Sequence, residues 1–145
     1  MMKKVALIAA MALAMAGCAT SPVLPSKAKL APTQNLLKFQ KKDPINNSQI
    51  TVVRDEGFVG SACSLAIFLD GKKSATLNPG EKAVFYVSTD VNTIGVGLND
   101  AGMCSGASIK TIHVSPSPEK PRIFRVGGDT QGFHISPFMI NEGEL

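Results

Sequence analysis

The segment CSLAIFLDGKKSATLNPGEKAVFYV, residues 63–87, decides the fold. Every second residue from 63 to 69 and again from 83 to 87 is apolar, which indicates strands with one buried face. Asp70-Gly71 predicts a two-residue hairpin turn, because a type I′ turn needs a positive φ at both central residues. Asn78-Pro79-Gly80-Glu81 predicts a second turn, since proline suits its second position and glycine accepts a positive φ. We therefore expect consecutive antiparallel strands here.

The same period of two continues outward from this segment. It predicts further strands over 50–54, 94–98, 107–114, 122–126 and 133–140. Gly95 and Gly97 leave one face of their strand bare, which favours the close approach of another backbone or a bend. No stretch has a convincing helical period, so residues 49–145 are predicted to form a small antiparallel β-sandwich or partly open barrel of about seven to eight strands.

The N-terminus has the pattern of an export signal. The chain has 145 residues, and Lys3 and Lys4 precede an apolar run over 5–16 that is too short to span a bilayer. Met15-Ala16-Gly17-Cys18 resembles a bacterial lipobox, with small residues directly before a cysteine. The resemblance predicts a signal peptide over 1–17, cleavage before Cys18, and diacylglycerol and an acyl chain such as palmitate on that cysteine.

The predicted anchor gives the expected location. Several acyl chains on one cysteine are enough for stable membrane attachment. Ala19 follows the cysteine, whereas lipoproteins kept in the inner membrane typically carry Asp there, so we expect the periplasmic face of the outer membrane. Removal of Lys3 and Lys4 lowers the formal net charge from +4 to +2, and residues 43–145 contain more acidic than basic residues. Nucleic acid is therefore not an expected partner.

Residues 18–48 are predicted to be a Pro- and Lys-rich tether behind the lipidated cysteine. Four prolines lie among Ser, Lys, Asn and Gln, a composition typical of flexible or semi-extended linkers. The stretch 35–42, NLLKFQKK, is an exception with two interpretations. It either lies on an anionic lipid surface or a partner, or it packs as a short ordered segment on its own domain.

Cys63 and Cys104 are the two cysteines that remain after the predicted cleavage. The periplasm is oxidising, so we expect a disulfide between them. Closing a loop of this length stabilises a domain by about 4 kcal/mol in the loop-entropy estimate.

Catalytic, metal and cofactor sites are not expected. Cys63, Cys104, His113 and His134 have none of the close pair spacings of a zinc site, and both histidines are expected to face solvent on strands. No serine lies in a G-x-S-x-G elbow, and Gly95-Val96-Gly97 lacks the strand-to-helix context of a dinucleotide loop.

A contact surface is therefore the remaining candidate. The loops 55–62 and 99–106 and the C-terminal strand carry apolar side chains suited to a protein partner. The alternative is that these side chains plug the ends of the sandwich. The candidate partner-binding residues are Phe58, Val59, Met103, Phe138 and Met139.

Residues 50–88 carry a family resemblance. Thr51–Arg54, Gly57–Ser61, Ile67–Lys72 and Leu77–Glu81 resemble a family of uncharacterised bacterial lipoproteins with a V-x-R … [DN]-G-K … P-G pattern. The resemblance implies a small β-sandwich at the cell envelope and no particular activity. The chain departs from that pattern after Ser88, where Thr89-Asp90-Val91-Asn92 replaces the usual Pro-Gly step.

The sequence thus predicts a non-enzymatic binding or assembly module of the cell envelope, anchored through Cys18. A second hypothesis is an inhibitor or immunity protein that blocks a periplasm-acting enzyme, such as a lysozyme-type hydrolase or a toxin, with a protruding loop. The third hypothesis is that the protein is an enzyme.

Overall fold

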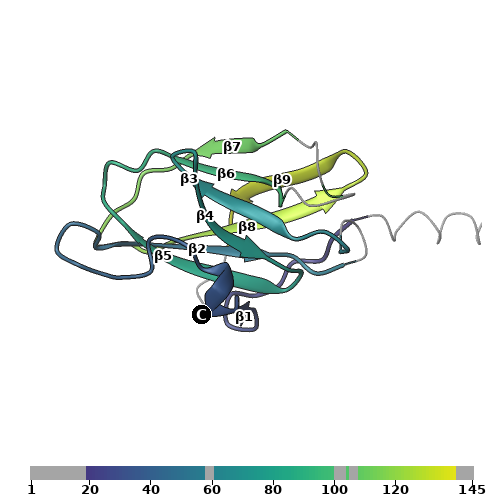
Figure 1. Ribbon diagram of the computed structural model, residues 1–145, viewed down its shortest axis with the longest axis horizontal. Coiled ribbons are helices and arrows are strands. Elements are labelled where there is room, and N and C mark those ends of the chain that lie inside the picture. Colours follow the sequence, from purple (N-terminus) through teal and green to yellow (C-terminus); the bar gives the residue numbers. More distant parts are fainter. Residues whose placement is uncertain (1–18, 58–60, 100–103, 105–107, 140–145) are drawn as a thin grey trace, which may run out of the picture.

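A computed structural model describes residues 19–57, 61–99, 104 and 108–139. Within these ranges the chain forms nine strands and one 3-10 turn, η2 (Figure 1). The strands are β1 (Lys29–Leu30), β2 (Ser48–Arg54), β3 (Leu65–Leu69), β4 (Lys72–Leu77), β5 (Glu81–Val87), β6 (Thr93–Leu98), β7 (Lys110–His113), β8 (Arg122–Asp129) and β9 (Gly132–Pro137), and η2 covers Thr33–Asn35.

Two sheets pack face to face, which confirms the predicted all-β sandwich. One sheet has five strands in the order β1-β5-β2-β8-β9, and the other has four in the order β4-β3-β6-β7. Most neighbours are antiparallel, but β2 pairs with β8 in parallel, and so does β1 with β5. Pairs that lie far apart in the sequence therefore hold the five-stranded sheet together.

The core lies between the sheets and follows the period of two. Ile50 and Val52 on β2, Phe85 on β5 and Phe124 on β8 are buried side chains of the five-stranded sheet. They meet apolar residues of β3, β4 and β6 from the facing sheet. Burying one such side chain contributes roughly 1.5–3 kcal/mol, so the alternating pattern is the main energetic reason for this fold.

The two predicted turns are confirmed. Asp70 and Gly71 have φ values of +44° and +72°, as a type I′ hairpin between β3 and β4 requires. Asp70 also accepts hydrogen bonds through Oδ1 from the backbone N–H groups of Asn92 and Thr93. Burial by itself would raise the pKa of Asp70, but these bonds, the Thr93 hydroxyl and the charge of Lys72 together lower it below its usual value. Gly80 in the second turn has a φ of +76°.

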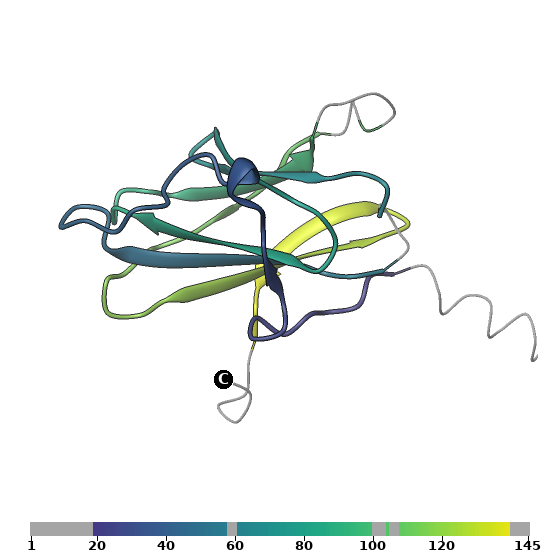
Figure 2. The same cartoon turned by 60° about the horizontal axis from the view of Figure 1, so that its bottom comes forward.

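The prediction of a flexible tether over 18–48 is wrong for the part that the structure describes. The chain from residue 19 crosses the outer face of the five-stranded sheet, forms β1 beside β5, and then contacts both sheets before β2 begins (Figure 2). Ala31 joins the core, and Leu36 and Phe39 pack against it. The packing interpretation of residues 35–42 is therefore confirmed, and the folded domain extends back to Ala19. Composition misled the prediction because a few well-placed apolar residues and edge hydrogen bonds order this segment.

The strands run between two ends of the sandwich, and one end carries a disulfide. Cys63, just before β3, is bonded to Cys104, after β6, as predicted. We call the end that holds this bond, the last residues of β2 and the β8–β9 turn the disulfide end. The opposite end, called the far end, holds the loop 41–47 before β2 and the Asp70-Gly71 turn (Figure 1).

A buried arginine fills the core side of the disulfide end. Arg54 is 3% exposed, and its Nη1 donates to the carbonyl oxygens of Cys63 and Leu77, each at 2.7 Å. Its guanidinium carbon lies 5.8 Å from the centre of the Phe133 ring, within the range of a cation–π contact. Burial lowers the pKa of Arg54 to about 10, and the charge of Glu81 partly opposes that shift. Arg54 therefore ties the loop before β3 and the end of β4 to the five-stranded sheet.

Candidate functional site

A sandwich of two sheets has two lateral sides, and in this protein they differ. One side lies between β4 and β5, the other between β7 and β9. On each side a strand from one sheet lies near a strand from the other. The outward backbone groups of these strands have no further strand of their own sheet to bond, apart from β1 beside β5.

The side between β4 and β5, called the covered side, is closed by residues 28–40. The backbone N–H of Ala31 donates to the Lys82 carbonyl at 2.9 Å, and that of Tyr86 donates to the Phe39 carbonyl at 2.8 Å. Leu37 donates to the Ser74 carbonyl of β4 at 2.9 Å. One segment thus bonds both sheets along this side and protects their edges from other chains.

The side between β7 and β9, called the open side, has no such cover from the residues that the structure describes. Val114 N–H donates to the Asn92 carbonyl, and β7 pairs with β6 in antiparallel register. Because bonded and unbonded positions alternate in such a pair, the backbone groups of Thr111 and His113 point away from β6. The same alternation, fixed by the bond from Phe138 to the Ile123 carbonyl, turns the groups of Phe133 and Ile135 away from β8.

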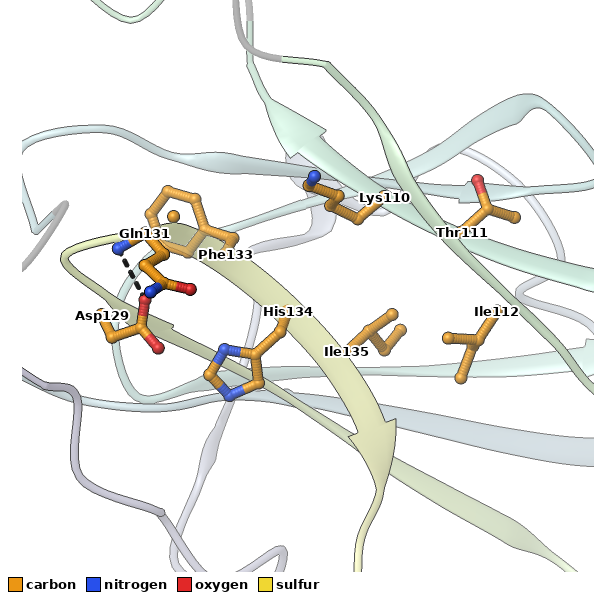
Figure 3. Close-up of a pocket in the computed structure, with 9 residues that line it drawn as sticks. Lys110, Thr111, Ile112, Asp129, Gln131, Phe133, His134 and Ile135 are labelled. Carbon is orange, nitrogen blue, oxygen red and sulfur yellow. Dashed lines mark hydrogen bonds between the residues drawn. The ribbon is translucent and has the colours of Figure 1, made fainter.

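A groove follows the open side (Figure 3). It consists of two adjoining hollows of about 310 and 460 Å³, which share Lys110, Gln131, Gly132 and Phe133. Ile112 on β7 and Ile135 on β9 face each other across the smaller hollow, and the exposed Lys110 lines both hollows. The groove thus combines apolar side chains, the cation of Lys110 and strand edges that no other described residue bonds.

The strand beside the groove carries an unusual contact. A Cβ atom on Gly95 would lie 2.9 Å from Cγ2 of Ile109, and one on Gly97 would lie 3.2 Å from its Cγ1. The bare face predicted for these glycines is therefore occupied by a side chain and not by another backbone. Ile109 remains 51% exposed, so it leaves apolar surface directly before β7.

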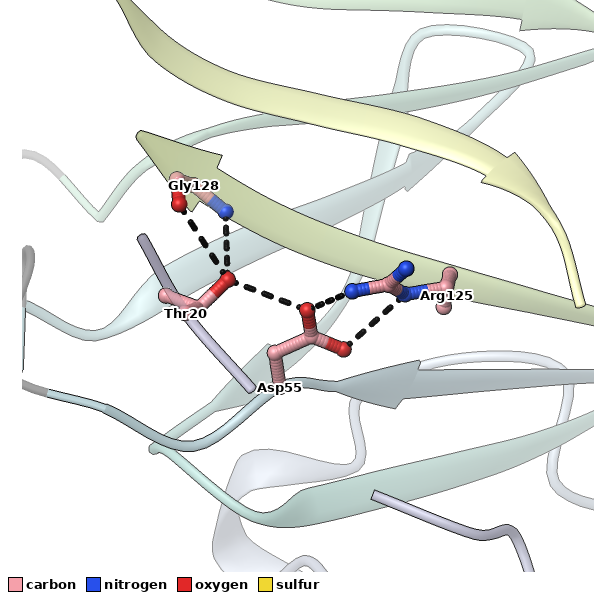
Figure 4. A network of polar contacts seen from close by, with 4 residues as sticks. All are labelled: Thr20, Asp55, Arg125 and Gly128. Atoms are coloured by element: carbon pink, nitrogen blue, oxygen red, sulfur yellow. Dashed lines mark hydrogen bonds and ion pairs between the residues drawn. The ribbon is translucent and has the colours of Figure 1, made fainter. Parts of the chain in front are cut away.

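A polar cluster at the disulfide end holds the start of the described chain (Figure 4). Asp55 is 2% exposed, and its carboxylate forms an ion pair with Arg125, whose Nε donates to Oδ1 at 3.2 Å. The Thr20 hydroxyl lies 3.0 Å from Oδ2 of Asp55, and Gly128 N–H donates to this hydroxyl at 2.8 Å. Thr20 N–H donates in turn to the Gly128 carbonyl at 2.9 Å.

Gly127 makes room for this cluster. A Cβ atom at this position would lie 2.9 Å from Oδ2 of Asp55 and 2.8 Å from Nε2 of His134. His134 and His113 are both exposed on strands, as the sequence predicts. In the described part of the chain, no three His, Cys, Asp or Glu side chains gather in a way that could hold a metal ion.

Of the predicted partner-binding residues, the structure describes Phe138 and Met139, and neither lines the groove. Cys18, Phe58, Val59 and Met103 lie outside the described residues. Phe138 is half-buried and Met139 is 89% exposed, and both line two other hollows, one with Pro22 and Arg125 and one with Lys120. Among the described residues no helix is long and apolar enough to cross a membrane.

The sequence interpretation missed both the groove and the Asp55 cluster. Lys110 occupies a position on the core-facing side of β7, opposite Val96. Proteins often place a charged residue at an otherwise apolar position of an exposed edge strand. Lys110 is such a residue, so the sequence could have indicated this edge. Asp55 carried no comparable signal, because carboxylates at strand ends are ordinarily explained by solvation.

Comparison with known protein families, with curated proteins and with solved structures found no match to this chain. The function of this chain is therefore inferred from its residues and their geometry.

Proposed function

We propose that this protein is a lipoprotein of the outer membrane, anchored through Cys18 at the periplasmic face, that binds another envelope protein without catalysing a reaction. The export signal and lipobox support the location. The pair of unlike sides supports the binding role: the covered side is closed by an extended segment, whereas no described residue bonds the outer edges of the open side beside the groove. This contrast is the observation that carries the proposal.

The partner we propose is an extended polypeptide segment that adds to β7. Its backbone would bond the outward groups of Thr111 and His113, as residues 28–40 bond β4 and β5 on the covered side. Edge addition supplies affinity through main-chain hydrogen bonds, and pockets for alternate side chains supply specificity.

The groove gives the chemistry of the segment. Ile112 and Phe133 favour an apolar side chain, and the exposed Lys110 favours an acidic group beside it. A segment in which an apolar residue and an acidic residue lie two positions apart would place both on the groove face, because strand side chains alternate.

Photo-crosslinking in cells tests the site. We expect p-benzoylphenylalanine at Lys110 or Gln131, on the groove, to yield one discrete adduct with an envelope protein. The matched positions Ile45 and Lys72, which are exposed away from the groove, should yield none. Peptide mapping should place the adduct in an extended segment of the partner. Equal yields at groove and control positions would contradict the proposal.

A proline substitution separates edge pairing from general surface contact. Thr111→Pro removes an outward N–H and leaves the bonds between β6 and β7 intact, so it should abolish the adduct without unfolding the domain. Thr111→Ala keeps the N–H and is the matched control, with the adduct retained. If both variants retain it, β7 does not pair with the partner. A partner that proves to be an envelope hydrolase or a toxin would assign the inhibitor role instead of assembly.

The anchor is tested separately. Mass spectrometry of the mature N-terminal peptide should find an acylated Cys18, and Cys18→Ser should leave the signal uncleaved. Sucrose-gradient separation should place the native protein with the outer membrane. An unmodified N-terminus would contradict the proposed location.

A further inference from the structure

Almost no chain separates the proposed anchor from the folded domain. Residue 18 is followed by Ala19, and Thr20 already belongs to the Asp55 cluster. Two residues span at most about 7 Å when fully extended. A free tether of 30 residues, by contrast, would reach roughly 30 Å. The position of Thr20 on the domain therefore decides which part of the domain the anchor holds near the bilayer.

Thr20 is fastened at the disulfide end by several independent contacts. Beyond its own bonds to Gly128 and Asp55, the next residue, Ser21, exchanges backbone hydrogen bonds with Glu56 at 2.7 and 3.0 Å. Gly57 has a φ of +134°, and a Cβ atom there would lie 3.0 Å from Cα of Thr20. The start of the described chain thus packs closely against the residues that follow β2.

The buried ion pair makes this attachment costly to release. Asp55 is buried and paired with Arg125, which is itself 27% exposed. If the segment at Thr20 left, the carboxylate would lose a hydrogen bond in a site with little solvent, and such losses are expensive for charged groups.

We propose that the disulfide end of the sandwich faces the lipid bilayer and lies among its headgroups, with the far end directed into the periplasm. The inference rests on the proposed lipidation of Cys18. Lys29 is exposed near this end, since its backbone N–H donates to the Gly80 carbonyl. Its charge suits an anionic headgroup region.

The orientation excludes another membrane contact. Lys41 and Lys42 begin the loop before β2 at the far end. Taking about 3.3 Å per residue, the seven residues of β2 separate this loop from the disulfide end by roughly 23 Å. The lysine-rich part of residues 35–42 would therefore face away from the bilayer that holds the anchor.

Fluorescence quenching on the lipidated full-length protein tests the orientation. Bimane would be attached at Gln131→Cys, in the β8–β9 turn, or at Ile45→Cys, in the far loop, with the native disulfide left intact. Proteoliposomes of phosphatidylethanolamine and phosphatidylglycerol would carry a nitroxide on the headgroup. We expect about fivefold stronger quenching at position 131, because contact quenching does not extend over roughly 23 Å.

A linker variant is the matched control. Insertion of 20 Gly/Ser residues between Ala19 and Thr20 adds a coil of roughly 25 Å, and it should lower quenching at position 131 to the value at position 45. Equal quenching at both positions without the linker, stronger quenching at position 45, or unchanged quenching at position 131 with the linker would each overturn the orientation.

Mass spectrometry of the same samples separates the two proposals. Acylated protein with the wrong quenching pattern would overturn the orientation and leave the proposed lipoprotein intact. Protein without acyl chains, and without quenching at either position, would overturn both.

Discussion

The covered and open sides of the sandwich differ in what lies along their edge strands. Each is a place where the two sheets end and backbone groups are left without a neighbouring strand. On the covered side, residues 28–40 bond β4 and β5 and bury Leu36 and Phe39 against the core. On the open side, the Cys63–Cys104 bond holds the β6–β7 connection, and no described residue bonds the outer edge of β7. The difference teaches that this domain can close a side with an extended segment, and that the described residues leave the other side without one.

The largest expected effect comes from removing the disulfide near the open side. The double variant Cys63→Ala and Cys104→Ala should lower the free energy of unfolding by about 4 kcal/mol on the loop-entropy estimate for a separation of 41 residues. Urea unfolding of oxidised wild type and of the variant would measure it. Reduced wild type is the control and should match the variant. A loss below about 1 kcal/mol would show that the open side is held by its packing alone.

Hydrogen exchange compares the two sides without a mutation. The amides of Ala31, Leu37 and Tyr86 are bonded on the covered side, whereas those of Thr111 and His113 point outward on the open side. We expect the first group to exchange at least about 100-fold more slowly, a difference of about 2.7 kcal/mol. Ile112 is the internal control, because its amide faces β6 and should be protected. Equal rates at positions 111 and 112 would contradict the assigned edge.

A substitution in the covering segment tests how much that segment contributes. Leu36→Ala removes a partly buried side chain from the core margin and should cost about 2 kcal/mol, at the low end for such truncations. Exchange at Leu37 and Tyr86 should accelerate, and exchange on β7 should not change. Leu37→Ala, at a position 50% exposed, is the matched control and should cost much less. Equal losses of unfolding free energy in the two variants would mean that residues 28–40 lie along the edge without packing against the core.

The smallest effect concerns Asp70 at the far end, remote from both sides. Its pKa is lowered in the folded protein, so its carboxylate contributes stability above its unfolded pKa of about 3.8. This contribution is lost as the pH falls through the lower folded value. Because Asp70 is exposed, we expect Asp70→Asn to lower the free energy of unfolding by less than about 1 kcal/mol at pH 7, and by progressively less as the pH falls below 3.8. Thermal unfolding across this pH range measures the stability difference between wild type and variant. A difference that grows as the pH falls would contradict the lowered pKa of Asp70.

Much of the fold follows from local sequence, and the confirmed features are those with a local cause. The Asp70-Gly71 turn, the Gly80 turn and the alternating strands depend on neighbouring residues, so the sequence alone predicts them. Gln49 of β2 pairs with Tyr86 of β5, and no short sequence pattern predicts this pairing. The parallel pairing of β2 with β8 cannot be predicted from local sequence either.

The candidate site was less predictable, for the same reason. The prediction placed binding on the loops at residues 55–62 and 99–106 and on Phe138 and Met139. The groove that carries the present proposal lies between β7 and β9, which come together only because of the order of strands in two separate sheets. Residues 18–48 were predicted to be a tether because they are rich in proline and lysine, and long-range edge bonds outweigh that composition in the described part.

The sequence by itself therefore determined the all-β class, the turns and the pair of cysteines, because each depends on a short pattern or on parity. Tertiary structure alone decided that residues 28–40 close one side, that the other side stays open, and that Thr20 is fixed beside Asp55 at the disulfide end. The physical reason is that an edge hydrogen bond joins backbone groups that lie far apart in the sequence. Only the complete packing of the two sheets determines which segment lies beside each edge.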